Sequence, residues 1–185
     1  RVERICAVCG SARTSPHNKV FLEGVRATLT ADPHWTGTHF DGRPVTGLRA
    51  MGRVYAGWAM SQAFYREHLY LDCGYASLED WMVRSWEANF LRRDGDDLLA
   101  SLRTWYLSDI SDNEIYGGDL DAALGAITAR AIIMPSRTDL YFTPEDSEAE
   151  TARMPNAEFR PIESIWGHRA GNPALNPDDE TTLRQ

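Results

Sequence analysis

The chain has 185 residues, of which 43% are hydrophobic and 25% charged, a composition typical of one folded domain with a sizeable core. Its formal net charge of -8, without a basic stripe, argues against nucleic acid and other phosphate polymers as partners. No apolar run approaches the roughly 20 residues that span a bilayer, so we expect no membrane partner.

The first predicted strand runs from Arg1 to about Cys9 and begins without Met, a cap or a polar leader. A whole protein seldom starts in this way, so we expect a partial sequence. Cys6 and Cys9 match a C-x-x-C pattern, but residues three apart on a strand point to opposite faces, whereas a redox pair needs its thiols at a helix start. No second C-x-x-C completes a zinc site, so we expect buried structural cysteines and no metal.

The number of cysteines also bears on the compartment. Cys6, Cys9 and Cys73 cannot form a closed disulfide framework, which favours reducing conditions. We therefore expect a cytoplasmic protein.

A polar cluster follows the first strand, at the edge where open α/β sheets bind ligands. It consists of Arg13, His17 and Asn18, and Ser15-Pro16 opens a helix through the same region. We expect Arg13 and Asn18 to contact substrate. The alternative is a plain helix start with one solvated arginine.

Helices dominate the next part of the chain. The first ends near Asp32, a second and longer one runs from Thr46 to about Phe64, a third follows a capping box at Ser77, and a fourth spans Asp97 to Leu107. One helix normally suffices for a crossover between parallel strands. The excess, rich in Trp, Tyr and Met, predicts a helical lid inserted between two strands.

Near the carboxyl end, two short apolar segments each deliver a polar residue to one edge of the predicted sheet. Residues 131–135 are too short and too uniformly apolar for a surface helix and indicate a buried strand, which Asp139 follows after a turn. Residues 158–163 indicate another strand, and His168 lies in the loop that leaves it. An acid and then a His at successive strand ends is the order in which an α/β-hydrolase supplies the last two members of its Ser, Asp, His triad.

Each of these two residues also has a simpler interpretation. A lone His is often a loop residue bonded to backbone, and a lone Asp is often a turn residue or cap. Asp146 competes with Asp139 as the acid, but its place in the first turn of a predicted helix is explained by the helix dipole. Order, strand ends and flanking motifs together favour the pair Asp139 and His168.

Residues 136–144 and 166–168 resemble the homoserine O-acetyltransferase-like branch of the α/β-hydrolase superfamily. Residues 9–18 look like the segment after its nucleophile helix, and residues 47–67 look like its central lid helix. The resemblance covers essentially the whole chain, but only the family's C-terminal half. It implies an α/β fold with parallel strands and an inserted lid: residues 1–185 form the C-terminal part of one domain, with the lid at about 15–116 and the acid and base segment at about 127–173.

One part of the family pattern is missing. The chain contains no G-x-S-x-G elbow, and its nearest candidates, Gly10-Ser11 and Gly57 to Ser61, lack the flanking glycines and the strand-to-helix turn. We predict Ser61 to lie inside a helix. The chain should therefore carry the acid and the base but not the nucleophile, and be inactive alone.

The predicted lid offers further candidates for substrate contact. Arg49 and Arg53 share one helix face, and the resemblance suggests that an arginine of this region meets a substrate carboxylate, although a solvated basic edge is the alternative. Tyr55, with nearby aromatic residues, lines either a substrate pocket or the core of the lid.

The resemblance implies acyl transfer through a Ser-bound acyl intermediate, with homoserine or a similar small hydroxyl compound as acceptor. An esterase of the same fold is the first alternative, and a non-catalytic binding domain with inherited triad remnants is the second. We expect no cofactor, a small-molecule acyl donor and acceptor with acyl-CoA as a co-substrate of the transferase, and a homodimer through the lid.

Overall fold

The computed structural model describes residues 2–184 and divides into two compact units. The first contains residues up to 14, residues 59–63 and residues from 108 onward, and it holds the sheet. The second contains residues 15–58 and 64–107 and is helical. The assignment of residues 15–116 to a lid stays a prediction.

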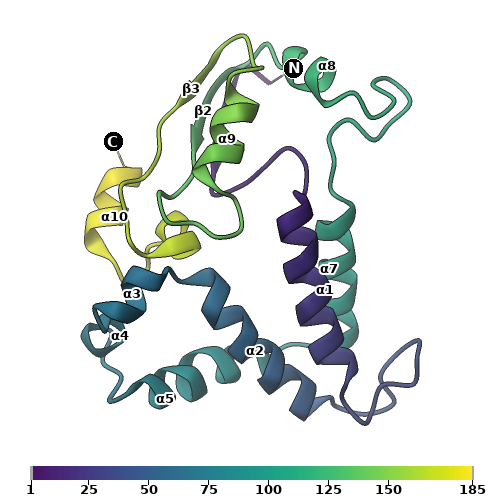
Figure 1. Ribbon diagram of the computed structural model, residues 1–185, viewed down its shortest axis with the longest axis vertical. Coiled ribbons are helices and arrows are strands. Elements are labelled where there is room, and N and C mark those ends of the chain that lie inside the picture. Colours follow the sequence, from purple (N-terminus) through teal and green to yellow (C-terminus); the bar gives the residue numbers. More distant parts are fainter. Residues whose placement is uncertain (1, 185) are drawn as a thin grey trace. The chain divides into compact units, whose positions relative to one another are not determined.

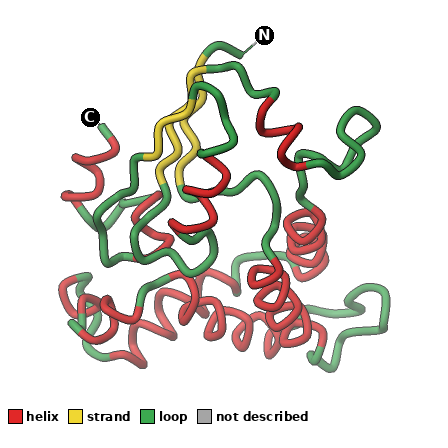
Figure 2. The backbone as a smooth tube through the Cα atoms, turned by 45° about the horizontal axis from the view of Figure 1, so that its top comes forward, coloured by secondary structure: helices red, strands yellow, loops and turns green. Residues whose placement is uncertain are grey.

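Three parallel strands form the sheet in the order β1-β2-β3, and Figure 2 shows them side by side. Their bounds are Arg4–Val8 for β1, Arg130–Met134 for β2 and Ala157–Phe159 for β3. The central strand β2 buries Ala131, Ile133 and Met134, as expected for an apolar strand paired on both edges. The parallel sheet of an α/β fold, predicted from the sequence, is confirmed for this portion of the chain.

The last strand is shorter than residues 158–163. Pro135, which follows β2, has no backbone N–H to donate to the neighbouring strand, so regular pairing stops at Phe159. The backbone N–H groups of Arg160 and Ile162 still donate to Ile133 and Pro135, at 2.9 and 2.8 Å. The chain therefore continues beside β2 and reaches the same edge of the sheet.

The cysteines differ from the prediction of buried thiols. Cys9 is buried, but Cys6 is exposed and Cys73 is intermediate. Within the described residues, β1 pairs on one edge only, with β2, and the Cys6 thiol lies on a face of β1 that is open to solvent. Burial of Cys6 was therefore a wrong prediction.

Short helices complete the first unit. Helix α9 packs against β2 and β3 (Figure 1) and begins where the Thr143 hydroxyl accepts from the backbone N–H of Asp146. Asn176 caps the last helix in the same way. The bounds are α8 Leu120–Gly125, α9 Pro144–Thr151, the 3-10 helix η2 Gly167–Gly171 and α10 Pro177–Leu183.

In the helical unit, α1 packs against α7, and buried side chains recur along α1 at helical spacing, among them Phe21, Val25 and Leu29. The Ser15 hydroxyl caps α1, as predicted. The bounds are α1 Pro16–Thr30, α2 Val45–Ala59, α3 Gln62–Arg66, α4 Leu69–Asp72, α5 Leu78–Trp81, the π-helix η1 Met82–Glu87, α6 Ala88–Phe90 and α7 Gly95–Leu107.

Two predicted helices are interrupted. The long helix from Thr46 ends at Ala59, and Ser61 lies in the break before α3, not inside a helix as predicted. The helix that follows Ser77 passes into the π-helix η1. A π-helix is rare and usually forms a single turn within an α-helix, so a search for α-helical spacing does not predict it.

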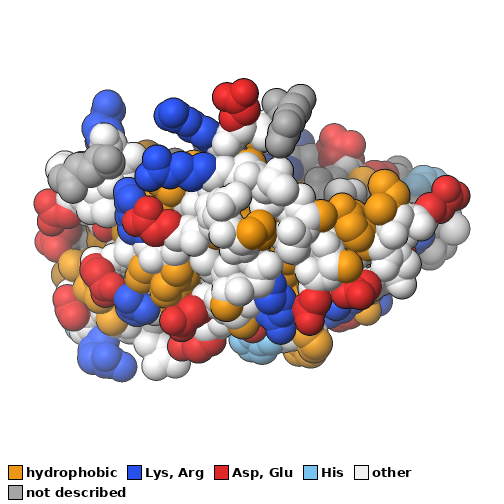
Figure 3. Space-filling view, turned by 90° about the horizontal axis from the view of Figure 1, so that it is seen from above, with side chains coloured by type: hydrophobic (Ala, Val, Ile, Leu, Met, Phe, Trp, Pro, Cys, Tyr) orange, Lys and Arg blue, Asp and Glu red, His pale blue; other side chains and the backbone are white. Residues whose placement is uncertain are grey.

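Within residues 2–184, none of the helices combines the length and the apolar character that crossing a bilayer requires. Figure 3 shows acidic and basic side chains interspersed over one face.

Candidate active site

Asp139 lies just past the carboxyl end of β2, at the end of a turn that starts at Ser136. Only 3% of the residue is exposed. Its Oδ1 accepts from the backbone N–H groups of Tyr141 and Phe142, at 2.8 and 3.2 Å. These two donors fix the plane of the carboxylate and leave Oδ2 facing away from the turn.

His168 lies in η2, beyond β3, and its Nδ1 is 2.9 Å from Asp139 Oδ2. The two residues are 29 positions apart in sequence, and the parallel sheet brings them to one edge. The ring also packs edge-on against Tyr141, with centroids 5.0 Å apart. An imidazole whose Nδ1 bonds to a buried carboxylate has Nε2 on its far side, where it can accept and return a proton.

The loop that carries His168 is fastened to the loop that carries Asp139. The Thr138 hydroxyl donates to the Ser164 carbonyl at 2.9 Å and accepts from the Gly167 N–H at 3.1 Å. The Ser61 hydroxyl donates to the Ile165 carbonyl. These side chains therefore hold the backbone next to the imidazole on two sides.

A buried carboxyl holds the other end of this loop. The Ser164 hydroxyl donates to Asp179 Oδ2 at 2.6 Å and accepts from the Trp166 N–H at 3.1 Å. Burial raises the pKa of Asp179 above its ordinary value, although hydrogen bonds from Ser164 and Asn176 oppose the shift. Helix α10 is thereby tied to the His168 loop.

Gly167, beside the imidazole, has a φ of +62°, and a Cβ built there would lie 2.8 Å from both the Ala59 oxygen and the Ser61 nitrogen. We expect Gly167→Ala to lower the free energy of unfolding by about 2 kcal/mol or more, through left-handed backbone and overpacking. Gly57→Ala is the control: a Cβ in that part of α2 meets nothing within 4 Å, and alanine favours a helix. Urea unfolding of both variants checks this; equal stability would contradict the close approach.

A thiol lies beside the pair. Ligating atoms of Cys9, Asp139 and His168 all lie within 4.8 Å of one another, a donor set that a soft divalent metal can use. The hydrogen bond between His168 and Asp139, however, already uses the two atoms that face each other. Asp139 and His168 therefore form a hydrogen-bonded pair, with the Cys9 thiol close beside it.

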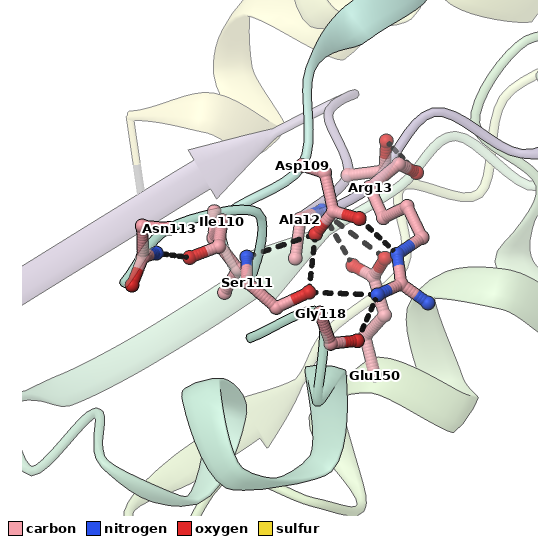
Figure 4. Close-up of polar contacts among 9 residues, drawn as sticks. Ala12, Arg13, Asp109, Ile110, Ser111, Asn113, Gly118 and Glu150 are labelled. Atoms are coloured by element: carbon pink, nitrogen blue, oxygen red, sulfur yellow. Dashed lines mark hydrogen bonds and ion pairs between the residues drawn. The ribbon is translucent and has the colours of Figure 1, made fainter. Parts of the chain in front are cut away.

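Arg13, predicted to contact substrate, is engaged in the first unit (Figure 4). Its Nε donates to Asp109 Oδ2 at 2.6 Å, and its Nη2 donates to Ser111 and to the Gly118 carbonyl at 2.7 and 2.8 Å. Burial alone would raise the pKa of Asp109, but hydrogen bonds from Ser111 and Arg13 outweigh it and lower the pKa. The guanidinium thus ties the turn after β1 to the segment before α8.

A second carboxylate holds the same turn. Both oxygens of Glu150, in α9, accept from the Ala12 N–H at 3.1 and 2.9 Å (Figure 4). Burial raises the pKa of Glu150, although backbone N–H groups of Ala12 and Arg13 oppose the shift. The turn is therefore held by side chains from two other segments.

The other predicted contacts, Asn18, Arg49, Arg53 and Tyr55, lie in the helical unit. Asn18 is buried near the start of α1. The Tyr55 ring lies 5.0 Å from those of Phe21 and Phe90, and Tyr55 lines a cavity of about 210 Å³; burial raises the pKa of Tyr55 to about 12. Their role in substrate binding stays a prediction.

Both arginines of α2 are paired with acidic side chains. One of these partners, Glu87, was not predicted from the sequence. Nε of Arg49 and Nε of Arg53 donate to the two oxygens of Glu87, at 2.6 and 2.5 Å. Arg53 also pairs with Glu79 through both terminal nitrogens, at 3.1 and 2.5 Å. Glu87 is 2% exposed although it is charged, since it lies in η1 against the helix that carries both guanidinium groups.

Besides Glu87, the contacts of Thr138 and Ser164 were not predicted from the sequence. Both are small hydroxyl residues within four positions of the predicted acid and base, and this proximity was the only signal in the sequence. Hydroxyl residues in turns usually bond to their own backbone, so sequence alone does not single them out.

No family model matches the chain, whereas individual proteins do. A probable esterase of Corynebacterium glutamicum is 31% identical over 170 residues, 91% of this chain and 48% of that protein. The ethyl acetate hydrolase of Pseudomonas veronii is 32% identical over 90% of this chain and 48% of its own length. Homoserine O-acyltransferases also match, at 26–28% identity.

The solved structure of an acetylester hydrolase from Corynebacterium glutamicum covers 99% of this chain with a TM-score of 0.90 and 30% identity. The chain covers 53% of that structure. It therefore spans about half the length of the relatives it matches.

Proposed function

Because the chain belongs to the homoserine O-acetyltransferase-like branch of the α/β-hydrolase superfamily, we propose that it supplies the acid and base of a serine esterase that cleaves short acyl esters. The observation that carries the proposal is the 2.9 Å hydrogen bond between His168 Nδ1 and the buried Asp139. In this role Asp139 holds the imidazole in one tautomer and stabilises its charged form.

The reaction needs a nucleophile that these 185 residues do not offer as a G-x-S-x-G elbow. We place it in a segment outside this sequence, since the relatives are about twice as long. His168 Nε2 takes the proton of that serine as its oxygen attacks the ester carbonyl, and then gives the proton to the departing alcohol. Water then attacks the acyl-enzyme with the same two proton transfers, which restores the serine and His168.

Two observations favour water over homoserine as the acceptor. The relatives at 31% and 32% identity are named as esterases, whereas homoserine acyltransferases match at 26–28%. Homoserine also carries a carboxylate, and Arg13, Arg49 and Arg53 are each already paired with an acidic side chain. The acetyltransferase reading, which the sequence placed first, is thus the less supported one, and acyl-CoA is a co-substrate only in that alternative.

A direct test joins this chain to the amino-terminal half of the Corynebacterium glutamicum esterase; we call this the joined protein. We expect it to hydrolyse ethyl acetate, measured as acid release, and to transfer no measurable acetyl group from acetyl-CoA to homoserine. Transfer faster than hydrolysis would overturn the esterase proposal. A folded joined protein that does neither, beside an active parent esterase, would favour a non-catalytic binding domain.

A further inference from the structure

The residues directly before His168 are held by side-chain hydroxyl groups. We call residues 164–167 the base loop; regular pairing of β3 with β2 ends well before it, at Phe159. Each residue of the base loop contributes one backbone group to a hydroxyl: the carbonyls of Ser164 and Ile165 accept from Thr138 and Ser61, and the N–H groups of Trp166 and Gly167 donate to Ser164 and Thr138. The position of the imidazole therefore depends on these hydroxyl groups.

Thr138 is the member of this set that adjoins the acid. Its hydroxyl donates to the Ser164 carbonyl at 2.9 Å and accepts from the Gly167 N–H at 3.1 Å. Thr138 directly precedes Asp139 in the chain, and Gly167 directly precedes the base. A hydrogen bond between residues 138 and 167 thus runs beside the 2.9 Å hydrogen bond between residues 139 and 168.

Another segment of the first unit packs closely against the base loop. A Cβ built on Gly167 would lie 2.8 Å from both the Ala59 oxygen and the Ser61 nitrogen, and the Ser61 hydroxyl bonds to the Ile165 carbonyl. The base loop therefore contacts residues 59–61 as well as the turn of the acid, residues 136–139. Its place is set by both contacts together, and loss of either one allows it to shift.

An exposed ion pair joins the same two segments. Arg137 Nη2 lies 2.6 Å from Glu163 Oε1, and the two side chains are 46% and 70% exposed. Water screens such a pair, and two long side chains can keep it while the backbone moves. The half-buried Thr138 bonds with a short side chain directly to backbone groups, so it restricts the base loop more closely.

We propose that Thr138 is a positioning residue of the esterase reaction, whose hydroxyl sets the distance between acid and base by joining the turn of Asp139 to the base loop. This inference rests on the proposed roles of Asp139 and His168. One hydroxyl makes both bonds to the base loop, as donor and as acceptor, so its removal breaks both. The imidazole then departs from the alignment that proton transfer to and from the nucleophile requires.

Thr138→Val removes the hydroxyl with little change in shape. We expect it to lower kcat of the joined protein for ethyl acetate by about tenfold or more, with KM nearly unchanged, because the hydroxyl bonds to backbone and not to the ester. Thr138→Ser keeps the hydroxyl and should restore most of kcat. Glu163→Gln, which removes only the exposed ion pair, should leave kcat unchanged.

Urea unfolding of each variant separates positioning from stability. A purely structural role of Thr138 would lower the free energy of unfolding while the folded protein keeps its kcat. Full kcat in a folded Thr138→Val would therefore overturn the proposal.

A second measurement depends neither on turnover nor on folding of Thr138→Val. In the 185-residue chain, the Gly167 amide should exchange with solvent at least about tenfold more slowly than in an unstructured chain, as followed by NMR. Thr138→Val should raise this rate, and Thr138→Ser should not. Exchange of wild-type Gly167 at the unstructured rate would overturn the proposal, since its N–H would then lack the bond to Thr138.

The two proposals fail in different ways. If His168→Ala abolishes turnover but a folded Thr138→Val keeps full kcat, only the inference about Thr138 is wrong. If the joined protein remains active as His168→Ala while the Gly167 amide is protected, the bond to Thr138 is present but the proposed function is wrong.

Discussion

Asp139→Asn is expected to lower kcat of the joined protein by about 10⁴-fold. The backbone N–H groups of Tyr141 and Phe142 require an acceptor at the Oδ1 position, so the carbonyl oxygen of asparagine takes that place. Its NH₂ group then faces His168 Nδ1 and donates to it. The imidazole is forced to carry its proton on Nε2 and no longer accepts the proton of the nucleophile.

Hydrolysis of ethyl acetate by the joined protein at neutral pH measures this effect. Asp146→Asn is the matched control, because Asp146 lies in the first turn of α9, where its backbone N–H bonds to Thr143, and its exposed side chain should matter little. His168→Ala should lose as much activity as Asp139→Asn. Full activity of Asp139→Asn together with inactive Asp146→Asn would instead assign the acid to Asp146.

Glu87→Gln is expected to lower the free energy of unfolding of the chain by about 2–3 kcal/mol, measured by urea unfolding. Glu87 is 2% exposed and bonds to both Arg49 and Arg53, so the neutral amide leaves two cations without their shared counter-ion. The expected value lies below that of a fully buried pair because the arginine side chains are 53% and 39% exposed and water screens them.

The control for this variant is Glu79→Gln. Glu79 pairs with Arg53, but its side chain is 66% exposed. The free energy of unfolding of Glu79→Gln should therefore fall by no more than about 0.5 kcal/mol. A similar loss in both variants would contradict the distinction between the buried and the exposed carboxylate.

The stabilisation by Glu87 should also depend on pH. Burial alone would raise its pKa, but hydrogen bonds from Arg49 and Arg53 outweigh burial and hold the pKa below 4.5. The stabilisation by ionised Glu87 is therefore fully present above the ordinary pKa of about 4.5. It is lost as the pH falls through the lower pKa that Glu87 has in the folded state. The difference in the free energy of unfolding between the wild-type chain and Glu87→Gln should therefore become smaller at acid pH.

The meeting of Asp139 and His168 at one edge of the sheet could be predicted because the ends of strands are recognised locally in sequence. A short apolar strand followed by a polar turn predicts where each of the two residues lies, whereas their roles as acid and base stay a prediction. The same reasoning predicted the helix start at Ser15, whose hydroxyl accepts from the backbone N–H of Asn18, three positions along the chain.

What sequence reasoning missed depends on contacts between distant segments. Glu87 is buried because Arg49 and Arg53 lie on another helix, and Ser61 ends a helix where its hydroxyl meets Ile165. Cys6 is exposed because of how β1 is placed in the sheet. Periodicity within one element carries no information about such partners.

The pairing of β1 with β2 also fixes the order in which this chain folds during synthesis. Residues 4–8 leave the ribosome before their hydrogen-bond partners, residues 130–134, which emerge only after the whole helical unit has been made. Helices form from local contacts in microseconds, whereas pairing between distant parallel strands is slow. The helical unit is therefore synthesised while the edge of β1 that later pairs with β2 is still open, and an unpaired strand edge exposes the nascent chain to aggregation during this interval.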